Sequence, residues 1–447
     1  MFRSIRLKNF KSYKDSGEVP FAPLTILIGA NNSGKSTILQ AMLMLKQTLE
    51  DASPSTALVT SGRQVDLSGF HDILHGKRTT GEQSFEVSLS IVDEAGWTRS
   101  QAIAPSGRQV RVPQSDRFNA VFSFQPRVGE IRVRRSTLWS GDNVMMDVRD
   151  GGRSWSSQVL PKQLPSGVKP GFRYFLPILG FENVRLPYPE IEQFVTVGDI
   201  QSYYWFRRFA GLSRIGPLRT RTPWYSGVGT RSASEFGFGG DNLLAALGNR
   251  EKVRGPNRTL AELVDEWMSK GFKILEKVHL ESLDRAGIVR MLQGDEFNGT
   301  KDINVAAMGE GISQVLPIVA RALAGDPWEC LLIEQPEIHL HPSLQAELAD
   351  LFIHTVQGAR RQVIVETHSE HLLLRLRRRI AESARADKPE IRPEDVAILY
   401  VEKDGSESRV RRLELNGKGH FADWPKGFFE EAYQEAMALA MASRRPE

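Results

Sequence analysis

The segment LTILIGANNSGKST, residues 24–37, contains the residue types that bind the phosphates of a nucleotide. Residues 29–36 match the pattern G-x-x-x-x-G-K-[ST] without departure. The two glycines let the backbone turn its N–H groups toward an anion, the lysine adds positive charge on the outer phosphates, and the serine hydroxyl can ligate Mg²⁺. The predicted phosphate-binding residues are Gly29, Asn31, Asn32, Ser33, Gly34, Lys35, Ser36 and Thr37.

Elements on both sides of this loop must hold it in place. A short apolar run, predicted to be a strand, ends at Gly29. The apolar residues 39–45 predict a helix, whose N-terminus adds partial positive charge to the same site. Because both flanking elements are present, the sequence predicts nucleotide binding here.

Two apolar runs in the second half of the chain also read as buried strands that end in polar residues. WECLLIE (328–334) ends at Glu334, and QVIVETH (362–368) ends in Glu366, Thr367 and His368. Ligands of parallel sheets lie outside the carboxyl ends of the strands. We therefore predict that Glu334 and Ser36 are metal ligands and that His368 contacts a γ-phosphate or an attacking water.

A further glycine pair opens the helical segment MGEGISQVLPIVARAL, residues 308–323. Small residues at a helix start can form a second anion site, here without a lysine. A plain helix entry explains the same pattern equally well. The candidate contacts are Gly309, Gly311, Ser313 and Gln314.

The composition is that of an ordinary globular protein of 447 residues, long enough for two or three lobes. No apolar run approaches the roughly 20 residues of a membrane span, so we expect no membrane insertion. The single cysteine, Cys330, excludes a disulfide framework and favours a cytoplasmic location. The net charge of +4 permits contact with nucleic acid without arguing for it.

Hydrophobic periodicity predicts an α/β fold with a mainly parallel sheet and a β-rich insertion. Residues 82–92, 117–126 and 130–139 alternate apolar and polar side chains, which is typical of antiparallel strands. Helical periodicity returns over 258–278, and a final helix is expected over 428–445. The expected division is residues 1–82 and 211–395 for the two parts of an ATPase head, 83–210 for the insertion, and 396–447 for a small C-terminal appendage.

The order of the motifs resembles the ABC-type ATPase heads of the SMC, RecF and OLD group, and more closely the bacterial AAA-labelled ATPases of that group. The motifs are NFKSY (9–13), GANNSGKST (29–37), GEGISQ (309–314), LLIEQPEIHLHP (331–342) and ETHSEHLLLRLRRR (366–379). Residues 214–225 (RIGPLRTRTPWY) also resemble a segment of that family. The tail from Tyr400 is similar to a small C-terminal domain of unknown function found on some of those ATPases.

This resemblance implies ATP and Mg²⁺ as cofactors and a homodimer, or a higher homo-oligomer, of heads with ATP between them. Ser313 and its glycines would reach the γ-phosphate held by the partner's phosphate loop. Glu334 would be the Mg²⁺-associated carboxylate and His368 the switch histidine. One departure is Gln335, which stands where the family usually has a glutamate as general base. Glutamine cannot accept a proton, so either hydrolysis is slow or Glu337 serves instead; the catalytic candidates are Gln335, Glu337 and His368.

Other functional classes fit less well. Glu402 and Asp404 resemble the opening of an OLD-type nuclease domain, but no D-x-D pair follows, so a two-metal nuclease is excluded. The ATPase of a membrane transporter is a weaker alternative, because the segments GEGISQ (309–314) and NFKS (9–12) fit that class poorly. His339 and His341, beside Pro342, are expected to cap a helix rather than to bind metal.

The sequence thus predicts an ATPase whose ATP-dependent dimerisation regulates a separately encoded effector, a nuclease or a toxin. The resemblance points to a nucleic-acid-linked process such as antiviral defence or DNA repair. The alternative is a nucleotide-gated scaffold with little hydrolysis and no nucleic-acid contact. Two basic clusters could meet phosphates, although a solvated helix face is favoured for the second: residues 132–135 and 375–379.

Overall fold

The computed structural model describes most of the chain. The described residues are 1–51, 53, 55–77, 84–92, 102–103, 109–110, 117–127, 130–149, 152–158, 168–181, 202, 204–227, 237, 239–248, 253, 258–275, 278–283, 288–295, 300–327, 329–387 and 389–425. The helix predicted over 428–445 lies outside them.

A mainly parallel sheet forms the centre of the molecule, with strand order β14-β19-β20-β4-β21-β22. Only the last pair, β21 with β22, is antiparallel. Every residue of β4, β19 and β20 is buried, as expected for parallel strands covered on both faces. The predicted α/β class with a mainly parallel sheet is therefore confirmed. The strands are β4 (Leu24–Ile28), β14 (Leu212–Ile215), β19 (Cys330–Glu334), β20 (Gln362–Glu366), β21 (Val396–Asp404) and β22 (Glu407–Leu413).

The C-terminal segment begins inside this sheet. Strand β21 pairs in parallel with β4, the strand that leads into the phosphate loop. On the other side of β4 lies β20, in which Glu366 is in register with Leu27. Strand β19 is one position further out, with Glu334 in register with Glu366. The carboxyl ends of these strands thus meet at one edge.

A second, antiparallel sheet has the order β11-β10-β9-β8-β5-β1-β2, with β3 paired to β1. The alternating segments predicted as strands form β5, β8 and β9, which confirms that reading. Because β5 pairs with β1, the β-rich region continues a sheet that starts near the N-terminus. Its strands are β1 (Phe2–Phe10), β2 (Tyr13–Asp15), β3 (Val19–Pro20), β5 (Phe85–Val92), β8 (Arg117–Arg127), β9 (Glu130–Ser140), β10 (Asn143–Arg149) and β11 (Ser154–Ser156).

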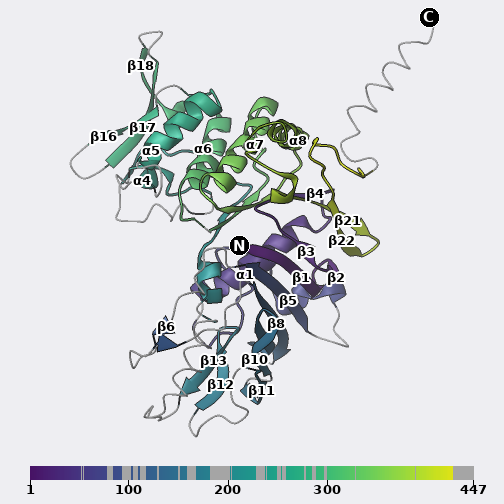
Figure 1. The fold of residues 1–447 in the computed structure, drawn as a ribbon. Helices are drawn as coiled ribbons and strands as arrows, with labels where there is room; N and C mark the ends of the chain where they lie inside the picture. The colour runs from purple at the N-terminus through teal and green to yellow at the C-terminus, as the bar shows by residue number, and fades with distance from the viewer. Residues whose placement is uncertain are drawn as a thin grey trace, which may run out of the picture.

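Two hydrophobic cores lie on the two faces of the parallel sheet. Leu27 and Ile364 point into the core shared with helix α1 (Lys35–Asp51) and the antiparallel sheet, whereas Ile26 and Val365 point into the core shared with the later helices. In Figure 1 the antiparallel sheet and α1 lie below, in purple and blue, and the helices from α4 onward lie above, in teal and green. The later helices are α4 (Leu243–Leu247), α5 (Leu260–Glu266), α6 (Glu310–Leu323), α7 (Pro342–Gln357) and α8 (Glu370–Ser383).

Short elements complete the described part of the chain. No helix in it is long and apolar enough to cross a membrane. A small antiparallel sheet pairs β15 and β16 with β17, and β17 with β18. The remaining elements are α2 (Phe70–Ile73), β6 (Ala102–Ile103), β7 (Gln109–Val110), β12 (Val168–Arg173), β13 (Leu176–Phe181), β15 (Ser226–Gly227), β16 (Val278–Ser282), β17 (Ile288–Asp295), β18 (Thr300–Asn304) and the 3₁₀ turns His75–Lys77, Val305–Ala307 and Pro393–Asp395.

The helical segment predicted over 258–278 is shorter in the structure. Helix α5 passes into a π-helical turn over Trp267–Gly271. Beyond it, Lys273 has a left-handed φ of 55°, which ends the helical run before β16. The prediction for His341 is confirmed, because its ring nitrogen accepts a hydrogen bond from the Ser343 N–H and caps α7.

Candidate functional site

The loop between β4 and α1 has the backbone of a phosphate cradle. Gly29, Asn32 and Gly34 have φ angles of 143°, 60° and 107°, in the region that favours glycine and asparagine. A Cβ added to Gly29 would lie 2.1 Å from the carbonyl oxygen of Val401, and one added to Gly34 would lie 2.6 Å from Ser408 Oγ. Both glycines are therefore required by conformation and by space. The C-terminal hairpin β21–β22 packs directly against the loop.

A cavity of about 730 Å³ lies over this loop. Residues 31–37 line one side of it, so all the predicted phosphate-loop contacts except Gly29 face the same space. Gln335, Glu366 and His368 line it from the ends of β19 and β20. Lys11 joins them from the turn between β1 and β2; its place in the NFKSY motif was the only sequence signal for it.

The Lys35 ammonium is held inside the loop. Its Nζ donates hydrogen bonds to the carbonyl oxygens of Gly29, at 3.0 Å, and Ala30, at 2.8 Å. Burial lowers the pKa of Lys35, although the nearby carboxylates of Glu366 and Glu337 oppose the shift. Within the described residues Lys35 forms no ion pair, so its charge is available to an anion in the cavity.

The Ser36 hydroxyl contacts a carboxylate that was not among the predicted metal ligands. Ser36 Oγ donates to Glu366 Oε1 at 2.8 Å. Glu366 ends β20 and is buried, and burial raises its pKa. Its second oxygen, Oε2, is buried without a hydrogen-bond partner in the described part of the chain. The sequence signal for it was an acidic residue at the end of an apolar run.

Glu334, the predicted metal ligand, is engaged elsewhere. Arg214 Nε, from β14, lies 2.6 Å from Glu334 Oε1, and both side chains are largely buried. Arg214 also donates to the backbone carbonyl of Gln64. Glu334 is not among the residues that line the cavity. The structure therefore pairs the Glu334 carboxylate with an arginine outside the cavity lining.

The three predicted catalytic residues differ in position. Gln335 has a φ of 46° and lines the cavity, and its N–H donates to the Glu366 carbonyl at 2.7 Å. Glu337 does not line it: its carboxylate accepts from Thr367 Oγ1 at 2.8 Å and from the His368 N–H at 2.6 Å. The His368 side chain does line it, and burial together with the Lys35 charge lowers the pKa of His368, which favours a neutral imidazole.

The predicted second anion site lies apart from this cavity in the same chain. Ser313 is buried in the first turns of α6, and its Oγ accepts from the Thr222 N–H at 3.3 Å. Gly311 is packed tightly, since an added Cβ would lie 3.0 Å from the His339 carbonyl oxygen. Gly309, by contrast, is exposed, with no atom within 4 Å of an added Cβ.

Arg219 connects helix α6 to Gln335 in the cavity wall. Its Nε donates to Gln314 Oε1 at 3.2 Å, Gln314 Nε2 donates back to the Arg219 carbonyl at 3.1 Å, and Arg219 Nη2 donates to the Gln335 carbonyl at 3.2 Å. Burial lowers the pKa of Arg219 to about 10. Arg219 lies in the segment 214–225 that resembles the family, but no sequence pattern indicated its contacts.

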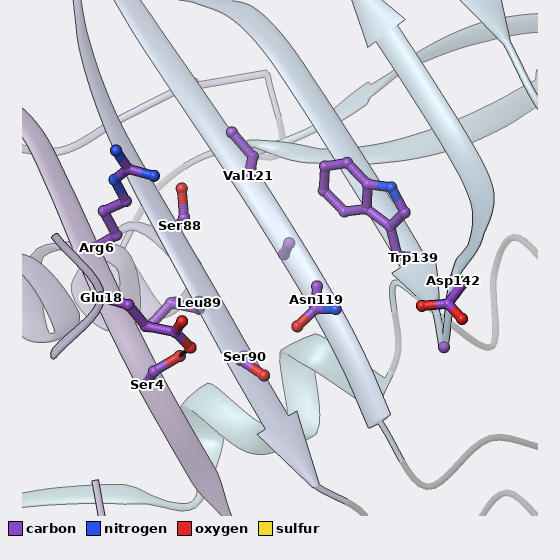
Figure 2. A pocket seen from close by; sticks show the side chains of 12 residues that line it. Ser4, Arg6, Glu18, Ser88, Leu89, Ser90, Asn119, Val121, Trp139 and Asp142 are labelled. Carbon is purple, nitrogen blue, oxygen red and sulfur yellow. Dashed lines mark hydrogen bonds between the residues drawn. The ribbon is translucent and has the colours of Figure 1, made fainter. Parts of the chain in front are cut away.

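A second hollow, of about 470 Å³, lies on the face of the antiparallel sheet and contains none of the predicted site residues. Figure 2 shows Arg6, Ser88, Val121 and Trp139 along neighbouring strands there. Ser4 Oγ donates to Glu18 at 2.7 Å, and Arg6 pairs with Asp15, so these polar groups are already partnered.

The predicted basic clusters have partners within the chain. Arg134, Arg135 and Arg149 line a third cavity, of about 530 Å³, together with Lys8. Arg135 and Arg149 both bind Asp147, at 2.8 and 2.7 Å. In the second cluster, α8 is tied to α7 and to the C-terminal segment by Arg375 with Glu347 and Asp350, Arg379 with Asp350, and Arg377 with the Gly419 carbonyl.

Comparison with solved structures finds SMC heads among the similar chains. An SmcHead bound to the C-winged helix domain of ScpA has 15% identity and a TM-score of 0.43, with 93% of this chain and 98% of that chain covered. The SMC head domain from Thermotoga maritima has 13% identity and a TM-score of 0.43, with 93% and 99% covered.

One curated relative matches over a short segment. An ATP/GTP phosphatase of Helicobacter pylori (strain ATCC 700392 / 26695) is 44% identical over 45 residues, which are 10% of this chain. The match spans only 12% of that relative's length.

Family models cover much more of the chain. The model described as a protein of unknown function (DUF3696) matches residues 391–439, which include β21 and β22. The model described as AAA ATPase domain matches residues 1–105 and 249–373, slightly more than half of the sequence. The match includes the phosphate loop, helix α6 and the segments that carry Glu334 and His368. The chain therefore belongs to the AAA ATPase domain family.

Proposed function

We propose that this protein binds ATP with Mg²⁺ in the phosphate-loop cavity, hydrolyses it slowly, and couples ATP binding to pairing of two heads. The observation that carries the proposal is the Lys35 ammonium, which is buried without an ion pair in the described residues and lines a cavity of about 730 Å³. A phosphate would replace its two carbonyl contacts with stronger charge-assisted hydrogen bonds. Membership of an ATPase family supports ATP as the ligand.

The residues around Ser36 fit a divalent cation. The Ser36 hydroxyl and the buried Glu366 carboxylate are hard oxygen ligands, and one Glu366 oxygen is unpartnered. The described residues contain no cluster of three or more His, Cys, Asp or Glu side chains able to hold a metal, so the phosphates would complete the site. Mg²⁺ bound there would neutralise charge on the phosphates.

The residues that could prepare the attacking water are Gln335 and His368, because both line the cavity. A neutral His368 imidazole can accept or donate a hydrogen bond, and Gln335 can orient a water molecule. Neither supplies the anionic base that a glutamate at 335 would provide. Glu337 supports this region by fixing the backbone of His368. This arrangement supports slow turnover.

Pairing of heads would complete the site. Ser313 and Gln314 contact their own chain, but the first turn of α6 is open to solvent at Gly309 and Glu310. A second head that presents this helix N-terminus to the bound nucleotide would add backbone N–H groups on the γ-phosphate side. Nucleotide binding and association would then stabilise each other.

The cellular role that we propose is regulation of a separately encoded effector, a nuclease or a toxin, in the cytoplasm, in antiviral defence or DNA repair. The motif resemblance supports it. Contact with nucleic-acid phosphates would use the cavity lined by Lys8 and Arg134, which contains more basic than acidic side chains. The second candidate is a nucleotide-gated scaffold with little hydrolysis; the absence of a carboxylate at Gln335 favours it.

Replacing Lys35 tests the phosphate-loop assignment. Lys35→Ala is expected to weaken ATP binding by about 100-fold, because charge-assisted hydrogen bonds contribute about 1.5–3 kcal/mol. Isothermal titration calorimetry measures the affinity. Lys14→Ala removes an exposed lysine 3.7 Å from Glu407 and is the matched control. Unchanged ATP affinity in Lys35→Ala would show that ATP does not bind in this loop.

Nucleotide-dependent pairing is tested by light scattering. ATP with Mg²⁺ is expected to double the molar mass of the wild type and to leave Lys35→Ala unchanged. Gly309→Arg should not disturb the folded monomer, because nothing lies within 4 Å of an added Cβ. In a dimer its side chain would obstruct the second head. Gly417→Arg, also at an open position, is the control and should still pair. Equal masses with and without ATP in the wild type would contradict ATP-driven association.

Because residue 335 is a glutamine, a glutamate introduced there is expected to increase the rate of ATP hydrolysis. Gln335→Glu is expected to raise single-turnover hydrolysis by about 10²-fold, because a general base contributes about 10²–10⁴-fold. Glu337→Gln and His368→Ala, assayed in parallel, show whether either residue already acts as the base. An inert Gln335→Glu combined with an inactive Glu337→Gln would assign the base to Glu337 and refute the slow-turnover account.

A further inference from the structure

Two of the hollows described above lie on one face of the antiparallel sheet. The core side chains point to the opposite face and alternate with the outward-facing ones along β1, β5 and β8. One row of outward-facing residues, paired across four neighbouring strands, lines the hollow of about 470 Å³ in Figure 2, here the Trp139 hollow: Ser4, Ser90, Asn119 and Trp139. Another row, paired across the same strands, lines the cavity of about 530 Å³, here the arginine cavity: Lys8, Glu86, Ser123 and Arg135.

The two rows are four residues apart on each strand, so the Trp139 hollow and the arginine cavity are neighbours. A strand rises about 3.4 Å per residue, which places the rows about 14 Å apart. Arg6, Ser88 and Val121 lie between the rows and line the Trp139 hollow. One elongated ligand can therefore contact both.

A β-bulge brings an additional arginine into the arginine cavity. Ser123 pairs with Arg135 and Phe124 pairs with Val133, which leaves Arg134 as an extra residue in β9. Consecutive strand residues normally face opposite sides of a sheet. Because of the bulge, Arg134 and Arg135 both line the cavity.

The charge of the arginine cavity favours an anion. Arg135 and Arg149 share the buried Asp147, yet their side chains remain 40% and 51% exposed. Lys8 lies 3.1 Å from Glu86. The four basic side chains that line the cavity thus have two carboxylates beside them, which leaves an excess of positive charge for the phosphates of a ligand.

The Trp139 hollow favours a polar ring instead of a phosphate, because the carboxylates of Glu18 and Asp142 line it. The half-buried Trp139 indole forms no ring contact within the described part of the chain. The side chains of Ser90, Asn119 and Asp142 form no hydrogen bond or ion pair there either. A nucleobase could stack on the indole, and its edge could exchange hydrogen bonds with these short polar groups.

We infer that single-stranded nucleic acid binds across this face of the antiparallel sheet, with a base on Trp139 and the neighbouring backbone phosphates in the arginine cavity. The inference deepens the proposed contact with nucleic acid and rests on it. It selects a single strand because the bases of a duplex are stacked on one another and their faces cannot reach an indole. The acidic side chains of the Trp139 hollow orient the strand, since they repel its backbone but accept hydrogen bonds from exocyclic amino groups.

The test is fluorescence anisotropy with labelled DNA and RNA single strands of about 15 nucleotides, the matching DNA duplex, and a DNA strand of the same length without bases. The full chain is used without ATP. Wild-type protein is expected to bind both single strands more tightly than the duplex, and to bind the strand without bases at least about tenfold more weakly than the intact strand. Tighter binding of the duplex, or equal affinity for the strand without bases, would overturn the inference.

Trp139→Ala is expected to weaken binding of the intact single strands by at least about tenfold and to leave the strand without bases unaffected. Trp139→Phe keeps an aromatic ring and should retain most of the affinity. Trp224→Ala removes a tryptophan that is 58% exposed outside both hollows and is the matched control. Wild-type affinity in Trp139→Ala would refute base stacking. If Trp139→Ala does not fold, the wild-type comparison of strands with and without bases decides.

The basic end of the site is tested by salt dependence. Arg134→Ala is expected to weaken binding of every strand and to reduce the slope of log affinity against log salt by about 0.7, the value for one phosphate of a single strand. Arg132→Ala, in the same strand but outside the arginine cavity, is the control. An unchanged slope in Arg134→Ala would exclude the arginine cavity as the phosphate contact.

These results separate the inference from the proposed function. Lys35→Ala should bind the oligonucleotides as the wild type does, because the phosphate loop takes no part in this contact. If Arg134→Ala weakens binding and Trp139→Ala does not, nucleic-acid contact stands and only the single-strand assignment is wrong. If no strand binds to the wild type, both the nucleic-acid contact and this inference are wrong, whereas the ATP site is judged by its own tests.

Discussion

The parallel hydrogen bonding of β4 to β20 is the constraint on which the rest of the site depends. It sets Glu366 in register with Leu27, so the end of β20 lies beside the start of the phosphate loop. Ser36, in the first turn of α1, then meets the Glu366 carboxylate, and Lys35 is enclosed between the loop carbonyls and that edge. A shift of one residue would turn the Glu366 side chain to the other face of the sheet.

At the carboxyl ends of the parallel strands, some buried charged groups are paired and others are not. Arg214 neutralises Glu334, and Arg219 binds Gln314 and the Gln335 carbonyl. Lys35 and Glu366 remain without direct ion pairs in the described part of the chain. The two unpaired groups flank the cavity, and a nucleotide with its cation would compensate both. Arg219 also connects helix α6 to Gln335 in the cavity wall.

Features encoded by neighbouring residues could be predicted from the sequence, whereas contacts that depend on the order of the strands could not. The phosphate-loop motif could be recognised in the sequence because its residues lie within eight consecutive positions. Strands β5, β8 and β9 could be predicted because their apolar and polar side chains alternate. The sequence also showed that 334 and 366 end strands. It did not show that β20 lies between β19 and β4, or that Ser36 contacts Glu366, because strand order is set by tertiary packing. The contact of Ser313 with Thr222 was hidden for the same reason.

The central claim is that the cavity beside Lys35 is a nucleotide site, and a structure with a non-hydrolysable ATP analogue and Mg²⁺ tests it most directly. The account predicts a triphosphate over residues 31–37, with Lys35 Nζ moved from the Gly29 and Ala30 carbonyls onto phosphate oxygens. A nucleotide bound elsewhere, with the Lys35 contacts at 3.0 and 2.8 Å retained, would contradict it.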